Sequence, residues 1–187
     1  VYKRQVVEGE SHFLEQQICD GLVDVGLFPT PIYSQDLESY PVLDEQILLA
    51  ISVENKKAIA IADSLMTGDG IREIAPFGAF PFILLREGLK LRTLVNRLCQ
   101  AECFVPKAVI GSETLDSCRS LVEDDYGITF LPSTLNRKGD DDKVKFYPLA
   151  SKLCFRQLVL VARSDRAKRF HLSEVAHIML QLSLIHI

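Results

Sequence analysis

The chain has 187 residues, of which 48% are hydrophobic and 25% are charged, and its formal net charge is -4. This composition is that of an ordinary globular protein, with enough residues for one large domain or two small lobes. A domain that binds nucleic acid by itself usually carries a clustered basic surface, so the acidic balance argues against that role for this chain. No apolar run reaches the roughly 18–20 residues that a membrane helix needs, so no membrane partner is expected.

The first predicted helix lies between Ser11 and Gly21. Ser11 is a suitable N-cap residue, and Phe13, Leu14 and Ile18 carry the apolar positions of the helix. Gly21 is a suitable residue to end it.

Two strands are predicted in the next part of the chain, and an irregular stretch follows them. Leu22–Leu27 comes directly after the glycine, and Gln46–Val53 is nearly all apolar, as a strand buried on both faces would be. Asn55–Phe80 contains several loop-forming glycines and prolines, which predict irregular structure with a short helix at most.

From residue 81 onward, strand-like and helical segments alternate. The predicted strands are Pro81–Leu85, Lys107–Ile110, Gly127–Leu131, Val144–Leu149 and Gln157–Ala162. The predicted helices carry apolar stripes over Leu91–Cys99, Leu115–Val122 and Leu172–Leu180. Asn136–Lys143 predicts an exposed turn. Strands that alternate with helices indicate an α/β protein with a mixed, mostly parallel sheet.

No set of residues predicts catalysis. His171 and His177 lie six residues apart, which is not the spacing of a helical metal pair, and no nucleophile elbow, Walker loop or dinucleotide-binding motif is present. The cysteines are an odd number, five, and they are scattered, which favours free thiols in a reducing cytoplasm over a disulfide framework. Cys99 and Cys103 lack the partners of a metal site, and two small core residues are the simpler interpretation. The chain is therefore not expected to be an enzyme or to hold a metal or cofactor.

The order of these elements resembles the regulatory domain of LysR-type transcription regulators. That domain has the two-lobed fold of type 2 periplasmic binding proteins. The resemblance is carried by three motifs: Ile18–Leu27, Phe80–Leu85 with Glu87, Gly88 and Arg92, and Gly111–Thr114 followed by Gly127–Pro132.

The resemblance implies two lobes. Lobe one would contain residues 1–77 and 148–187, lobe two residues 78–147, and the chain would cross between them near Phe77–Phe80 and Tyr147–Leu149. Two such crossovers suit hinge motion. The resemblance also implies that the first strand and helix of lobe one, a linker helix and a winged helix-turn-helix lie upstream of this chain.

Loops that lead into helix N-termini at an inter-lobe cleft would form the effector site, because such termini attract anions. The candidate residues are Phe28, Thr30, Arg86, Glu87, Gly88, Ser112, Glu113 and Thr114. Ser112 or Thr114 is first an N-cap, Arg86 is either a carboxylate clamp or a solvated charge, and Phe28 is either a core or a cleft-wall residue. Arg92 and Arg97 are expected in solvent on the polar face of their helix.

The function that the resemblance implies is sensing of a small, anionic metabolite in the cytoplasm. Occupancy would control transcription by rearranging a homodimer or tetramer, with DNA bound by the upstream domain. The helices at Ser11–Asp20 and Leu115–Asp124 are the candidate interface. Two alternatives stay open at this point: a solute-binding receptor of a transporter and an enzyme on the same fold.

Overall fold

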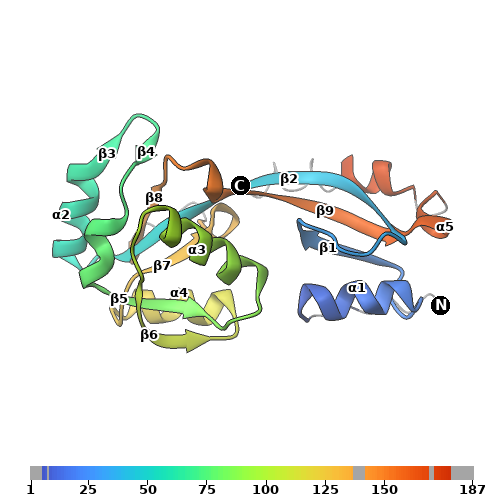
Figure 1. The fold of residues 1–187 in the computed structure, drawn as a ribbon, viewed down its shortest axis with the longest axis horizontal. Helices are drawn as coiled ribbons and strands as arrows, with labels where there is room; N and C mark the ends of the chain where they lie inside the picture. Colours follow the sequence, from blue (N-terminus) through green and yellow to red (C-terminus); the bar gives the residue numbers. More distant parts are fainter. Residues whose placement is uncertain (1–5, 8, 137–141, 169–170, 178–187) are drawn as a thin grey trace. The chain divides into compact units, whose positions relative to one another are not determined.

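The structure is a computed structural model that describes residues 6–7, 9–136, 142–168 and 171–177 (Figure 1). The chain divides into two compact units, Val1–Asp44 with Arg156–Ile187, and Glu45–Phe155. Parts of the predicted Leu172–Leu180 helix and Asn136–Lys143 turn lie outside the described residues. None of the described helices is long and apolar enough to span a lipid bilayer.

The first unit is a small sheet covered by helix α1 (Ser11–Cys19). Strand β1 (Val25–Pro29) pairs antiparallel with β9 (Phe155–Arg163), from Val25 opposite Ala162 to Pro29 opposite Leu158. The sheet order then continues to β2 (Leu37–Ser52), and the short helix α5 (Ser164–Ala167) follows β9. Figure 1 shows α1 running beside β1.

The packing of α1 on β1 explains why this segment folds as it does. Ile18 and Phe28 are buried with Val159 and Val161 in one apolar cluster. Gly26 allows the close approach, because a Cβ at this position would lie 2.8 Å from the Ile18 side chain. The predicted N-cap is off by one residue, since Glu10 occupies the cap position and Ser11 is the first helical residue.

The second unit is built around the other half of β2. This half pairs antiparallel with β7 (Thr129–Pro132) and with β8 (Val144–Pro148). Strand β5 (Pro81–Leu85) pairs with β6 (Lys107–Ser112) in parallel, and an isolated parallel bridge joins Phe82 to Ile128, just before β7.

Helices and short segments complete the second unit. Its α-helices are α2 (Lys56–Leu65), α3 (Lys90–Ala101) and α4 (Leu115–Glu123). Strands β3 (Met66–Thr67) and β4 (Gly70–Ile71) form a small antiparallel hairpin. Short 3-10 helices cover Ala75–Ala79, Ser133–Leu135 and Lys152–Cys154.

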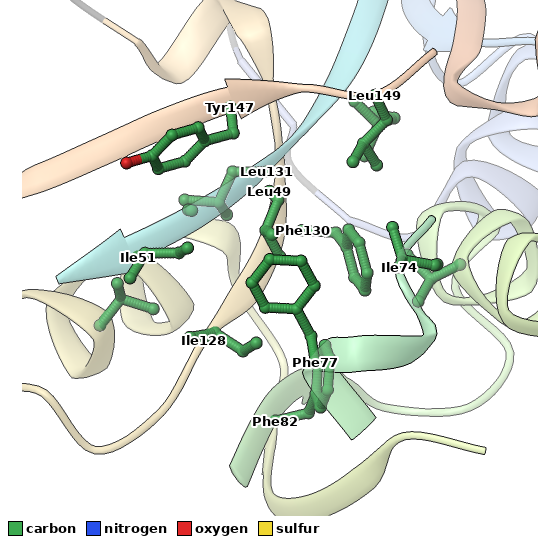
Figure 2. Packing of buried hydrophobic residues seen from close by; sticks show 14 of the residues in the cluster. Leu49, Ile51, Ile74, Phe77, Phe82, Ile128, Phe130, Leu131, Tyr147 and Leu149 are labelled. Atoms are coloured by element: carbon green, nitrogen blue, oxygen red, sulfur yellow. The ribbon is translucent and has the colours of Figure 1, made fainter. Parts of the chain in front are cut away.

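The core of the second unit is a continuous cluster of aliphatic and aromatic side chains (Figure 2). The Phe82 ring stacks on Phe130 with 5.7 Å between their centroids. Helix α3 buries the stripe that its periodicity predicted, including Leu91, Val95 and Leu98. These contacts fix the ends of β5 and β6, where the candidate site lies.

The structure differs from the sequence-based expectations in three respects. The unit boundaries fall at residues 44/45 and 155/156 and not at 77/78 and 147/148, because residues 47–52 and 66–77 pack with β7, β8 and the β5 region. The segment Asn55–Phe80 contains the regular helix α2 and a hairpin.

The third difference is the sense of strand pairing. The α/β class is confirmed, but the ladders β1–β9, β2–β7, β2–β8 and β3–β4 are antiparallel. The parallel pair β5–β6 lies where strands and helices alternate along the chain, which is the part of the sequence that predicted parallel pairing. Alternation of strands and helices therefore predicts parallel pairing correctly for β5 and β6, but not for these antiparallel ladders.

Candidate functional site

The loops after β5 and β6 meet at one edge of the second unit. Because the two strands are parallel, their carboxyl ends lie side by side, with Leu85 paired to Ser112. The Arg86 N–H donates to the Ser112 carbonyl at 2.8 Å. The sequence therefore predicted correctly that these two loops come together. They contain the candidates Arg86, Glu87, Gly88, Ser112, Glu113 and Thr114.

The N-terminus of α4 forms one side of this site. Thr114 is the N-cap residue, and its hydroxyl accepts a hydrogen bond from the Ser117 N–H at 3.2 Å. A helical hydrogen bond runs from the Cys118 N–H to the Thr114 carbonyl at 3.2 Å. The N–H groups of Leu115 and Asp116 thus belong to the first turn, which has no carbonyl partner within the helix and carries a partial positive charge.

Ser112 is part of the structure beneath this helix end. It is buried, its hydroxyl accepts from the Thr114 N–H at 3.3 Å, and it donates to the Thr114 carbonyl at 3.1 Å. Burial raises the pKa of the neighbouring Cys118 thiol, and a hydrogen bond with Ser112 partly opposes this effect. Ser112 therefore shapes the loop, and Cys118 is a neutral core thiol beneath it.

The β5 loop is held by Arg92, in the first turn of α3. The Arg92 guanidinium donates to the Leu85 carbonyl at 2.9 Å and lies 2.7 Å from a Glu87 carboxylate oxygen. Asn96 accepts from Arg92 at 2.9 Å and donates to Glu87 at 3.3 Å. The Arg92 side chain is only 16% exposed, so the expectation that it is solvated is wrong, whereas Arg97 is exposed as expected.

Gly88 and Arg86 occupy the open side of the same loop. Gly88 has a φ of 92° and no heavy atom within 4 Å of the position that a Cβ would take. The left-handed backbone and the open space agree with the expectation that a glycine lets a ligand approach the main chain closely. Arg86 is exposed, directly before Glu87.

The candidates in the first unit have a different environment. Phe28 is 2% exposed and packs in the α1–β1 core, and this packing fully accounts for an aromatic residue at that position. The Thr30 N–H donates to the Gln157 carbonyl at 2.8 Å, which continues the β1–β9 pairing. A ligand contact by either residue stays a prediction.

A separate pocket of about 410 Å³ lies in the first unit, where no sequence pattern predicted a site. It is lined by Cys19, Gln35, Asp36, Arg163, Ser164 and Asp165. Its polar groups bind one another: Arg163 pairs with Asp165 at 2.5 Å, and Ser164 donates to the Asp36 carbonyl at 2.9 Å. The Arg163–Asp165 hydrogen bond lowers the pKa of the Asp165 carboxyl, so this is an ion-paired surface cluster.

No group of three or more His, Cys, Asp or Glu side chains among the described residues is arranged to hold a metal ion. The three cysteines of the second unit's core are all protonated thiols at neutral pH. Burial raises the pKa of Cys99 to about 11 and that of Cys154 to about 12. The hydrogen-bond donors that this edge could offer a small polar molecule are the first-turn N–H groups of α4 and the exposed Arg86 side chain.

Comparison with known proteins identifies the family. Residues 3–182 match the LysR substrate binding domain family, so the chain belongs to that family. The chain is 29% identical to the uncharacterized HTH-type transcriptional regulator YcgK of Bacillus subtilis (strain 168), over 96% of this chain and 56% of that protein. The chain thus spans about half the length of this curated relative.

Solved structures show the same fold at low sequence identity. A reduced form of OxyR from N. meningitidis superposes with a TM-score of 0.69 at 19% identity, over 92% of this chain and 76% of that chain. The effector binding domain of QuiR in complex with shikimate gives 0.66 at 17% identity, over 83% of this chain and 69% of that chain. The fold is therefore that of the LysR regulatory domains, with their periplasmic-binding-protein-like architecture.

Proposed function

We propose that the chain senses a small anionic metabolite for a LysR-type DNA-binding transcription regulator, with the loops after β5 and β6 as the anion site. The observation that carries this proposal is the meeting of those loops, joined by the Arg86 N–H and the Ser112 carbonyl at 2.8 Å. Arg86, the open Gly88 and the capped N-terminus of α4 all lie in or directly after these two loops. Each of these groups favours a negatively charged ligand.

The QuiR structure supports the ligand class. That domain binds shikimate, which is a carboxylate, on the fold that this chain shares. A carboxylate would accept hydrogen bonds from the first-turn N–H groups of α4 and from Arg86. The two compact units would correspond to the two lobes of the sensor.

Regulation would require coupling between ligand occupancy and assembly. We place the subunit interface on helices α1 and α4, as the family resemblance implies. One observation supports α1: Phe13 is 51% exposed on a helix whose other apolar side chains pack on β1. If α1 forms a dimer, Phe13→Glu lowers the mass of the assembly in sedimentation experiments, while His12→Glu at the neighbouring exposed position leaves a milder effect.

The experiment that tests the ligand site compares two arginines. Wild-type chain, Arg86→Gln and Arg97→Gln are titrated by calorimetry with a panel of carboxylates and phosphate esters, beginning with shikimate. Both variants remove one exposed positive charge from the second unit, but only Arg86 lies in the site. Loss of a charge-assisted hydrogen bond costs about 1.5–3 kcal/mol, which is a weakening of roughly 10- to 100-fold.

Equal affinity of the two variants for a bound metabolite would reject the assignment of Arg86. A panel in which only neutral or cationic compounds bind would reject the anionic ligand class. Chemical turnover of a bound compound would instead favour an enzyme on the same fold.

A further inference from the structure

We infer that Arg92 is a positioning residue for the effector site. Arg92 cancels the charge of Glu87 and holds the Leu85–Gly88 loop in the conformation that binds the ligand. The inference rests on the proposed function, because it takes this loop as part of an anion site. Arg92 does not face the ligand in this assignment. It acts through the loop.

The Arg92 guanidinium binds two parts of the loop, the Leu85 carbonyl at 2.9 Å and the Glu87 carboxylate at 2.7 Å. Its Nε donates to Asn96 at 2.9 Å, and Asn96 in turn donates to the second Glu87 oxygen at 3.3 Å. Two residues of α3 therefore fix both oxygens of Glu87, one position before the open Gly88.

Arg92 also sets the charge balance at this edge of the unit. Besides Arg92, the two loops and the first helical turns after them carry the cations Arg86 and Lys90 and the carboxylates of Glu87, Glu113 and Asp116. Without a further cation this edge would present more negative than positive charge to a ligand. Arg92 supplies that cation from beside the loop. With Arg92 included the formal charges balance, and the partial positive charge at the N-terminus of α4 then favours an anion.

The ion pair between Arg92 and Glu87 is not needed for folding. The Glu87 side chain is 71% exposed, and an ion pair with one solvated partner adds little to the stability of the fold. Removal of the pair is therefore expected to leave the protein folded and to change the loop. This makes the function of Arg92 measurable apart from stability.

The experiment uses four variants of the whole chain: Arg92→Gln, Arg97→Gln, Glu87→Gln and the double variant Arg92→Gln/Glu87→Gln. Arg97→Gln is the control, because it removes the same charge from the exposed face of the same helix. Shikimate and inorganic phosphate are the binding probes, followed by chemical shifts of the loop amides. Hydrogen exchange at residues 86–88 reports the order of the loop without any ligand.

We expect Arg92→Gln to bind the anionic probe roughly three- to tenfold more weakly, as one uncompensated charge near a partly solvated site would cause. Arg97→Gln should bind like the wild type. In the double variant, removal of the Glu87 charge should restore most of the lost affinity, which a merely structural arginine would not allow. Exchange at residues 86–88 should be faster in Arg92→Gln than in Arg97→Gln.

Two results would overturn the inference: equal loop exchange in Arg92→Gln and Arg97→Gln, or no recovery of affinity in the double variant. Failure of the proposed function has a different signature. In that case the wild-type loop amides do not respond to either probe, while the exchange measurement still decides whether Arg92 orders the loop.

Discussion

Replacement of Gly70 by alanine tests whether the segment after β2 belongs to the second unit. Gly70 has a φ of 112°, and a Cβ on it would lie 2.6 Å from the Pro148 carbonyl oxygen at the end of β8. Gly68, two residues earlier in the same hairpin, has no heavy atom within 4 Å of its Cβ position. Gly68→Ala is thus a matched control in which the same methyl group meets no obstacle.

The expected cost of Gly70→Ala has two parts. A non-glycine residue at this φ costs about 1–3 kcal/mol, and the forced shift of the Pro148 backbone adds about 1–3 kcal/mol. Together they predict a loss of about 2–6 kcal/mol in the free energy of unfolding. Gly68→Ala should change it by no more than about 0.5 kcal/mol.

Urea denaturation measures the loss, and hydrogen exchange locates it. The Ala150 N–H donates to the Ile71 carbonyl at 2.9 Å, so protection should fall in β4, in β8 and at Ala150. Protection of β1 and β9 in the other unit should change less. Equal stability of the two variants, or a loss confined to β1 and β9, would refute the assignment of residues 66–77 to the second unit.

Three further predictions concern caps, thiols and pH. Thr114→Ala and Asn55→Ala each remove an N-cap bond and should each cost about 1 kcal/mol in urea melts, but only Thr114→Ala should also weaken anion binding in calorimetry. In the native protein at pH 8, a thiol reagent should label Cys103 fastest, since this cysteine is exposed. Equal labelling rates of Cys103 and the buried thiols, measured by mass spectrometry of the labelled peptides, would contradict this. These buried thiols are those of Cys99, Cys118 and Cys154. Burial raises the pKa of these thiols above 9.0, to about 11 for Cys99. The thiols of the unfolded chain therefore ionise at lower pH than those of the folded protein, and the free energy of unfolding should fall as the pH rises from about 9 towards 11. A free energy of unfolding that stays constant over this pH range would reject the prediction.

The sequence predicted best those elements whose signal is local. The stripe from Leu91 to Cys99 gave α3, and the apolar run bounded by Pro81 gave β5 with both of its ends. Helix α2 was missed because the glycines and proline after it dominated the interpretation. Asn55 followed by the buried Ala58, Ile59 and Ala62 was the signal that would have found it.

The sequence predicted only those features of the site that follow from the order of strands and loops along the chain. That the loops around Gly88 and Ser112 meet follows from parallel pairing of the strands before them. The role of Arg92 does not, because helical periodicity assigns a residue to a polar face but does not show what packs on that face. Its partners, Leu85 and Glu87, are set by the tertiary position of the β5 loop.

The sense of strand pairing decides where such a site can form. In an antiparallel pair the carboxyl end of one strand lies beside the amino end of the other, so only one strand-to-helix loop reaches a given edge. In the β5–β6 pair both carboxyl ends reach the same edge, and each is followed by a helix, α3 or α4. Two loops and a capped helix N-terminus are then available to one ligand. The antiparallel ladders of the described structure do not bring two such loops together, so the candidate site lies at the edge formed by β5 and β6. Arg92 lies beside this edge, where it contributes to the charge of the site.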